Sequence, residues 1–147
     1  MKKENAMKYL KMFLSAAGLI VFAAVSAQAG SIKIIANPSV KPDAITAGEL
    51  VRVFLEDSNV LNDGSHAVPV LEKGGAAHDA FLKEYLGKSD AALQTFYRSL
   101  VFTGKGSMPK VLGSDAEVVA YVAKTKGAIG YVASASAAEG VKTLEVK

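Results

Sequence analysis

The sequence has no cysteine and no tryptophan, and it has only two histidines. The lack of cysteine excludes structural disulfides, thiol catalysis and lipid attachment through a cysteine. The spacing of His66 and His78 from the neighbouring acidic residues matches no metal-ligand pattern, so we expect both histidines at the surface. Ser65 and Ser107 lack the residues that surround a catalytic nucleophile. We therefore predict no metal, no cofactor and no enzymatic activity.

Beyond residue 29 the chain also lacks an excess of charge of either sign. The whole sequence has 17 basic and 14 acidic residues, but four lysines and one glutamate lie in the first 29 residues. Residues 30–147 therefore carry thirteen residues of each sign, and their formal net charge is zero. Proteins that bind nucleic acid usually have a basic excess on the binding surface. The composition gives no support for a nucleic-acid partner.

The first 29 residues have the three parts of a secretory signal peptide. Four lysines precede an apolar segment at residues 12–27. The small-x-small motif Ala27-Gln28-Ala29 lies at the end of this segment. The apolar segment is shorter than the roughly 20 residues that a membrane-spanning helix needs. We predict cleavage after Ala29 and export to a periplasm, with an uncleaved membrane anchor as the alternative. After cleavage we expect no stable membrane insertion, and residues 30–147 are enough for one domain.

Residues 30–147 alternate between the hydrophobic patterns of strands and helices. Four segments fit strands: Ile32–Ala36, 68–71, 128–132 and 141–146. Helices are predicted to begin near Ala47, Ala76, Asp90 and Asp115. Two capping boxes, which mark the first and the last of these helix starts, are formed by Thr46 with Glu49 and by Ser114 with Glu117. Helices between strands predict an α/β fold, with one mixed, mostly parallel sheet that helices cover on both faces.

The stretch at residues 68–86 is central to this pattern, because it joins a strand to a helix through a glycine turn. Gly74 and Gly75 separate the apolar strand from a segment whose apolar residues recur at helical spacing. Backbone N–H groups at a helix start can bind an anion, and Lys73 can add a cation beside them. Two interpretations stay open: an oxyanion site at Lys73, Gly74, Gly75, Ala76 and Ala77, or a plain strand-to-helix turn.

A second candidate segment is the glycine-rich loop at residues 102–109, which contains two hydroxyl groups and one lysine. Its glycines do not have the spacing of a nucleotide-binding P-loop. If the loop takes part in binding, Thr103 and Lys105 are its candidate ligand residues.

Three motifs follow one another after residue 45. They are residues 46–55 with Val60-Leu61-Asn62-Asp63-Gly64, then Val68-Pro69-Val70 before a glycine turn and a helix, and then Gly127-Ala128-Ile129-Gly130-Tyr131. In this order they resemble the second lobe of the phosphate-binding proteins of bacterial ABC transporters. The loop Phe102-Thr103-Gly104-Lys105-Gly106 is similar to short, single-lobe members of that superfamily. The resemblance implies a single three-layer lobe like one lobe of a type II periplasmic binding protein. It also implies phosphate as ligand and an ABC permease, or another periplasmic protein, as partner.

The glycine turn departs from the family pattern. Family members read Arg-x-Asp-x-Ser-Gly-Thr there, and those side chains hold the phosphate. An alignment without gaps places Leu71, Lys73, Gly75, Ala76 and Ala77 at these five positions. The loss of the arginine alone should weaken binding severely. Two functions therefore remain open: a solute-binding-protein-like domain with weak or indirect oxyanion binding, and a non-transport periplasmic interaction or scaffold module.

The signal-peptide interpretation yields the first testable prediction. We expect the exported protein to begin at Gly30 and to be recovered in the soluble periplasmic fraction, because Ala27-Gln28-Ala29 is a cleavage motif. N-terminal sequencing of the protein from a fractionated culture checks this. Recovery of the chain in the membrane fraction with residues 2–29 still attached would support the anchor instead.

Overall fold

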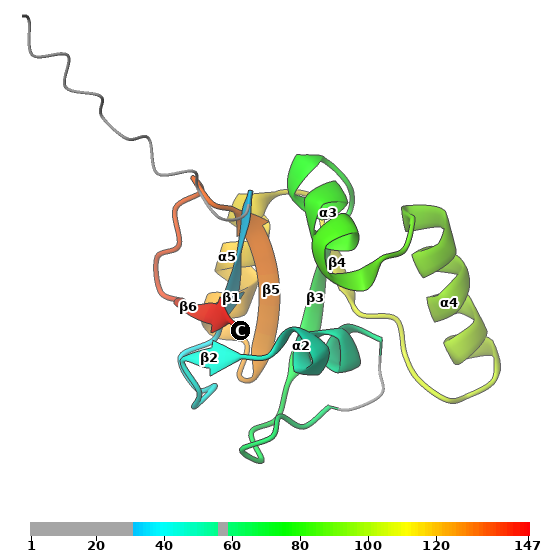
Figure 1. Ribbon diagram of the computed structural model, residues 1–147, viewed down its shortest axis with the longest axis horizontal. Helices are drawn as coiled ribbons and strands as arrows, with labels where there is room; N and C mark the ends of the chain where they lie inside the picture. The colour runs from blue at the N-terminus through cyan, green and yellow to red at the C-terminus, as the bar shows by residue number, and fades with distance from the viewer. Residues whose placement is uncertain (1–30, 56–58) are drawn as a thin grey trace, which may run out of the picture.

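The computed structural model describes residues 31–55 and 59–147, and these residues form the predicted α/β fold (Figure 1). In chain order the elements are β1 (Ile32–Ala36), β2 (Ala44–Ile45), α2 (Ala47–Phe54), β3 (Val68–Glu72), α3 (Ala76–Phe81), the π-helix η1 (Leu82–Leu86), α4 (Asp90–Phe102), β4 (Lys110–Leu112), α5 (Asp115–Lys124), β5 (Ala128–Ala133) and β6 (Lys142–Val146). The predicted signal peptide lies outside the described residues. Within them, no helix combines the length and the hydrophobicity needed to cross a membrane.

The six strands form one sheet in the order β2-β6-β1-β5-β3-β4. The pairs β2–β6, β5–β3 and β3–β4 are parallel, whereas β1 runs antiparallel to both of its neighbours. The predicted mixed, mostly parallel sheet is confirmed. The strands β2 and β4 were not predicted from the sequence, because strands of two and three residues are too short to show an alternating pattern.

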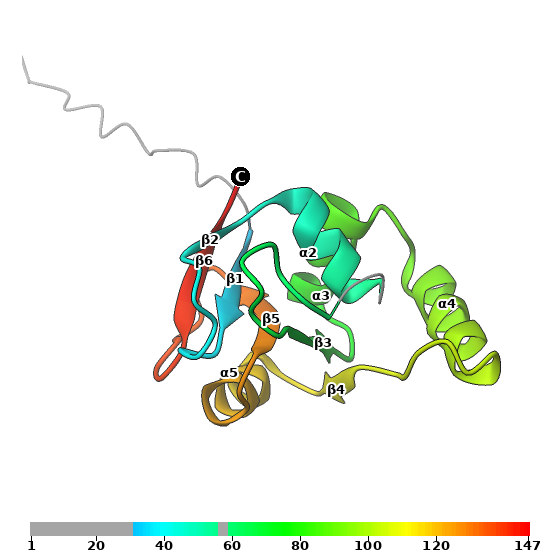
Figure 2. The ribbon, with the colours of Figure 1, turned by 90° about the horizontal axis from the view of Figure 1, so that it is seen from below.

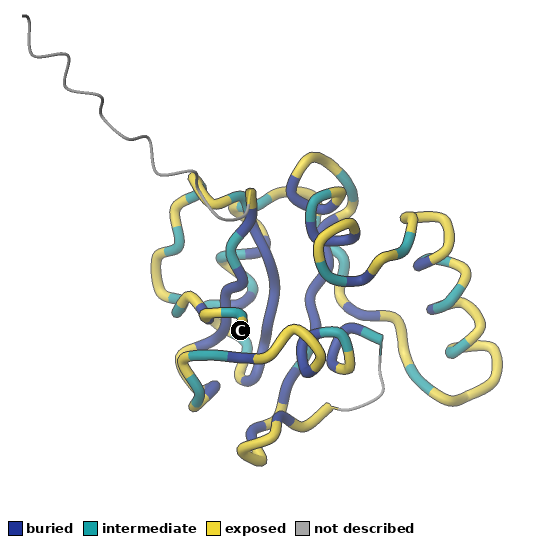
Figure 3. Tube along the Cα trace, in the orientation of Figure 1, coloured by how far each residue is buried: buried dark blue, intermediate teal, exposed yellow. Residues whose placement is uncertain are grey.

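Helices cover both faces of the sheet, which confirms the three-layer prediction (Figure 2). Adjacent residues of a strand point to opposite faces. Ile34 accordingly joins the larger core cluster, formed with α2, α3, η1 and α4, whereas Ile35 packs in the smaller cluster with Val118 and Val122 of α5. The central strands are buried along their length, while much of α4 is exposed (Figure 3).

All four predicted helix starts are confirmed, but the capping boxes are only half formed. The Thr46 hydroxyl accepts the N–H of Glu49 at 3.1 Å, and the Ser114 hydroxyl accepts the N–H of Glu117 at 3.2 Å. In neither case does the glutamate side chain accept the backbone N–H of the capping residue. Glu49 instead accepts the N–H of Asn62 at 2.5 Å, and Glu117 accepts the N–H of the residue before the cap at 2.7 Å. Glu49 thereby fixes the loop that leads to β3.

The helix predicted from Ala76 is divided in two. Residues 76–81 are α-helical, and Leu82–Leu86 form a π-helical turn that ends at Gly87, whose φ is 60°. The π turn leaves Leu82 and Leu86, at its two ends, both buried in the core. A periodicity analysis assumes one regular helix, so it cannot locate such a turn.

Gly127 supplies a stability test of the loop that precedes β5. Its φ is 77°, and an added Cβ would lie 2.7 Å from the backbone oxygen of His66. We expect Gly127→Ala to lower the free energy of unfolding by about 2–4 kcal/mol, since a left-handed conformation and a backbone clash add together. Gly64→Ala is the matched control, because Gly64 has a φ of 85° but no atom within 4 Å of the added Cβ. Chemical denaturation should show that Gly64→Ala lowers the free energy of unfolding by about 1 kcal/mol. Equal losses for the two variants would contradict the contact with His66.

Candidate functional site

The turn between β3 and α3 is open to solvent and depends on its two glycines. Gly74 has a φ of 141° and Gly75 a φ of 96°, both in the region that favours glycine. A Cβ added at either position would have no atom within 4 Å. The N–H of Lys73 donates to the carbonyl of Leu112 in β4 at 2.8 Å, which fixes the start of the turn. A small ligand can therefore approach this backbone from solvent.

The start of α3 leaves backbone donors available at this turn. The helix has no side-chain cap, and its first hydrogen bond runs from the N–H of Asp79 to the carbonyl of Gly75 at 3.0 Å. The N–H groups of Ala76, Ala77 and His78 consequently have no acceptor within the helix. Ala76 is exposed, whereas Ala77 is only 8% exposed. Since α3 has only six residues, its dipole adds little to the attraction for an anion.

A series of hydrogen-bonded polar groups, buried except for the exposed Asp90, lies behind the turn and holds α3 in place. The N–H of Glu72 donates to the hydroxyl of Tyr131 at 3.0 Å, and that hydroxyl lies 2.5 Å from Nδ1 of His78. Nε2 of His78 lies 2.8 Å from a carboxylate oxygen of Asp90. The arrangement fits a neutral His78 whose Nε2–H donates to Asp90 and whose Nδ1 accepts from Tyr131. This chain links β3, β5, α3 and α4.

The expected surface position is therefore wrong for His78, which is only 2% exposed, and right for His66. The sequence contained a usable signal, because His78 lies three residues before Phe81 and one turn of helix places both on one face. Phe81 is fully buried and stacks on Tyr131, with 4.0 Å between ring centroids. Tyr131 is as deeply buried, and this burial raises the pKa of its phenol.

A pair of acidic side chains lies beside this chain, and the sequence analysis did not identify it as a feature of the site. Glu72 is only 8% exposed, and its carboxyl group lies close enough to that of Asp115, at the start of α5, for each to shift the pKa of the other. Its Oε2 atom is buried and has no hydrogen-bond partner among the described residues. Strand alternation was the available signal, since Val70 and Glu72 share the face of β3 that α5 covers.

The two acids have opposite pKa shifts. Burial, together with the hydrogen bond to Asp115 and repulsion from its charge, raises the pKa of Glu72 to about 7. Burial also acts to raise the pKa of Asp115, but hydrogen bonds from Ser136, the N–H of Ala133 and Glu72, and the charge of Lys33, together lower it. Glu72 thus holds the proton of the pair, and it gains a negative charge behind the turn as the pH rises through 7.

Thr103 and Lys105 lie at the opposite end of α4 from the turn. Asp90, the first residue of α4, contacts His78, whereas Thr103 follows the last residue of this 13-residue helix. At 1.5 Å per residue the helix separates Asp90 from Thr103 by about 20 Å. The Thr103 hydroxyl donates to the carbonyl of Ser99 in its own helix at 2.8 Å, and Lys105 is exposed in the following loop. The structure therefore brings Lys73, Gly74, Gly75, Ala76 and Ala77 together, but not Thr103 and Lys105.

The described residues contain no group of three or more histidine, aspartate or glutamate side chains that could hold a metal ion. Glu72 and Asp115 supply only two carboxyl groups to such a site. At this site the chain offers backbone N–H groups and one lysine, which suit a small anion rather than a cation.

The fold matches solved structures of binding proteins. One is PstS from Borrelia burgdorferi, at 17% identity and a TM-score of 0.61, over 80% of this chain and 47% of that one. Another, from Clostridium perfringens, is assigned as a phosphate ABC transporter substrate-binding protein and was solved with bound phosphate; it matches at 16% identity and a TM-score of 0.59, over 79% of this chain and 44% of that one. The chain has the fold of a periplasmic binding protein lobe. The resemblance seen in the three motifs is confirmed for the fold.

An ABC-type phosphate transport receptor from Vibrio cholerae matches at 12% identity and a TM-score of 0.53, over 79% of this chain and 46% of that one. The chain thus spans less than half the length of the solved proteins that it matches. No family model matches the sequence, and no curated protein does. The structure from Clostridium perfringens is described as a substrate-binding protein and that from Vibrio cholerae as a transport receptor.

The raised pKa of Glu72 yields a prediction about stability and pH. The pKa of Glu72 is near 4.5 in the unfolded chain and about 7 in the folded protein, so the folded protein binds this proton more tightly. As the pH rises from 4.5 through 7, Glu72 therefore lowers the free energy of unfolding. Glu72→Gln removes this titration while its amide can still donate to Asp115. The free energy of unfolding of the variant minus that of wild type should increase from pH 5 to pH 8, by on the order of 1–3 kcal/mol. Urea denaturation at both pH values measures the gain.

Glu84→Gln is the control for this experiment, because Glu84 is exposed on η1. Its difference from wild type should change little between the two pH values. A difference between Glu72→Gln and wild type that stays constant from pH 5 to pH 8 would contradict a buried acid that titrates near neutral pH.

Proposed function

We propose that this chain is an exported solute-binding-protein-like lobe, related to phosphate transport, that binds a small oxyanion weakly at the β3–α3 turn. The observation that carries the proposal is the open glycine turn at the carboxyl end of β3, where the N–H groups of Ala76 and Ala77 have no acceptor in the helix. Ligands of open α/β sheets bind beyond the carboxyl ends of strands. The likeness of the fold to phosphate-binding chains supports phosphate as the anion.

The binding should be weak for reasons visible in the turn itself. Its only cationic side chain is Lys73, and residues 71–77 contain no arginine and no hydroxyl side chain to serve as the family's ligands do. Glu72 and Asp115 lie directly behind the turn, and a charge on Glu72 opposes an anion. The proposal includes a periplasmic location. It also includes a protein partner, either an ABC permease or another periplasmic protein. It includes no catalytic activity.

A titration followed by NMR tests the proposal. Phosphate and sulfate are added to uniformly labelled protein at pH 6, where Glu72 is mostly protonated, and backbone amide shifts are recorded. We expect the amides of Gly74, Gly75, Ala76 and Ala77 to shift with a dissociation constant on the order of millimolar, about 4 kcal/mol of binding free energy. Lys73→Ala should weaken binding severalfold, whereas Lys105→Ala should not, because Lys105 lies beyond the far end of α4.

Two outcomes would contradict this proposal in different ways. A micromolar dissociation constant would mean that additional ligands, or a second lobe, contribute to the site. The absence of shifts at residues 74–77, even at high anion concentration, would favour the second candidate, a non-transport interaction module. That candidate is supported by the exposed apolar residues on α4.

A further inference from the structure

Helix α4 has one stripe that packs against the core and another that faces outward. The inner stripe is anchored by Leu93 and Tyr97, both fully buried, and the Tyr97 hydroxyl donates to the backbone carbonyl of Phe54. The outer stripe consists of residues spaced at i, i+3, i+4 and i+7, namely Thr95, Arg98, Ser99 and Phe102. Figures 1 and 2 show α4 at the outer side of the molecule. The helix is therefore held along one side and presents the other to solvent.

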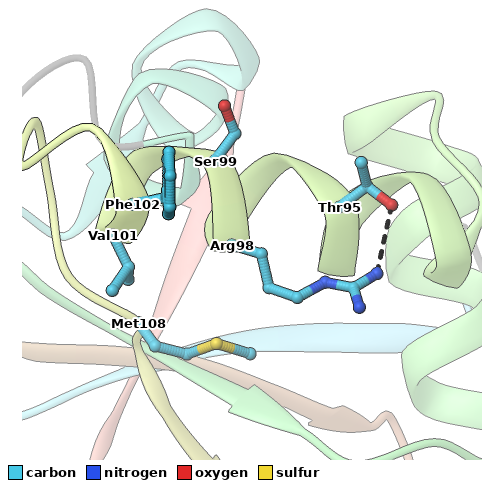
Figure 4. A pocket seen from close by; sticks show the side chains of 6 residues that line it. All are labelled: Thr95, Arg98, Ser99, Val101, Phe102 and Met108. Atoms are coloured by element: carbon cyan, nitrogen blue, oxygen red, sulfur yellow. Dashed lines mark hydrogen bonds between the residues drawn. The ribbon is translucent and has the colours of Figure 1, made fainter.

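The outer side of α4 exposes a cluster of large apolar side chains. Phe102 is 92% exposed, Val101 is 51% exposed and Met108 is 42% exposed. Together with three residues of the outer stripe they line a hollow of about 710 Å³, whose surface is almost entirely apolar. Val101 and Arg98 point from the helix towards Met108, which belongs to the segment that returns to β4 (Figure 4). Scattered exposed apolar residues are ordinary, but a cluster that lines a hollow indicates a binding surface.

The charged residues in the stretch of sequence that forms this hollow are all basic. Residues 91–114 contain three basic residues, Arg98, Lys105 and Lys110, and no acidic residue. This is a local excess in a chain whose residues 30–147 are neutral overall. Arg98 donates only to the hydroxyl of Thr95, at a long 3.4 Å, and no carboxylate pairs with it in the described part of the chain. The hollow therefore suits an apolar partner surface flanked by acidic residues.

We propose that α4 and residues 107–109 form a docking groove for an amphipathic helix of a partner protein. The apolar stripe of that helix packs on Val101, Phe102 and Met108, and acidic residues beside the stripe pair with Arg98 and Lys105. A helix suits this surface, because its apolar stripe can enter the open hollow between α4 and Met108 while the protruding Phe102 packs against its side. The proposal does not depend on oxyanion binding at the β3–α3 turn.

The test measures the binding of two fluorescently labelled synthetic peptides to the full chain, which is purified from expressing cells. Fluorescence anisotropy reports the binding. Both peptides have 18 residues with leucines at helical spacing, and the flanking residues are glutamate in one and lysine in the other. We expect the glutamate peptide to bind at least about tenfold more tightly than the lysine peptide. Phe102→Ser should weaken glutamate-peptide binding by about tenfold or more, since a phenylalanine buried on binding is lost. Arg98→Glu should weaken the glutamate peptide and strengthen the lysine peptide.

The controls separate a loss of docking from a loss of folding. Phe102 and Arg98 are exposed, so the melting temperatures of both variants should match wild type within a few degrees. Lys83→Glu reverses an exposed charge on η1, away from the hollow, and should leave the affinity for both peptides unchanged apart from a small general charge effect.

Three results would overturn the proposal. The first is equal binding of the two peptides that Phe102→Ser does not reduce. The second is absence of peptide binding while vesicles of mixed neutral and anionic lipid bind the protein in a Phe102-dependent manner, which would assign the surface to membranes. The third is a Phe102-dependent dimer in sedimentation velocity without peptide binding, which would assign it to a second copy of this chain.

Discussion

The hydrogen-bonded chain from Asp90 through His78 and Tyr131 to the N–H of Glu72 is the interaction on which the candidate site depends. It joins β3, α3 and α4, which follow one another closely in the sequence, to the distant strand β5, and both side chains at its centre are almost fully buried. Buried polar groups are costly unless each finds a partner, so these hydrogen bonds favour the observed orientation of α3 against β5. The direction in which the glycine turn points follows from that orientation, and so does the attachment of α4 to α3.

The same buried region limits what the turn can bind. Backbone N–H groups and Lys73 attract an anion, whereas Glu72 and Asp115 place acidic groups behind the same backbone. Below pH 7 the pair shares a proton and carries a single charge, part of which Lys33 balances. The chain thus has the fold of one lobe of the solved binding proteins, while acidic groups behind its glycine turn oppose negative charge there once Glu72 is ionised.

Helix α4 separates two regions of different character. Its first residue, Asp90, is hydrogen-bonded to the buried His78. Its last turn exposes Val101 and Phe102 to solvent, in a stretch of sequence whose only charged residues are basic. An exposed phenylalanine contributes nothing to the stability of the isolated fold, because its apolar surface remains in water. The residues that bind this lobe together and the residues suited to a partner therefore lie at opposite ends of one helix.

The sequence by itself determined the α/β class, the four helix starts and the longer strands, because periodicity and capping are local properties that a few neighbouring residues encode. It also located the glycine turn, since positive φ angles at Gly74 and Gly75 require glycine. The tertiary structure alone decided which partners the buried polar groups find: Tyr131 lies 53 residues after His78, and Asp115 lies 43 residues after Glu72. Such contacts depend on how strands and helices are placed in space, and a pattern of neighbours does not contain that information.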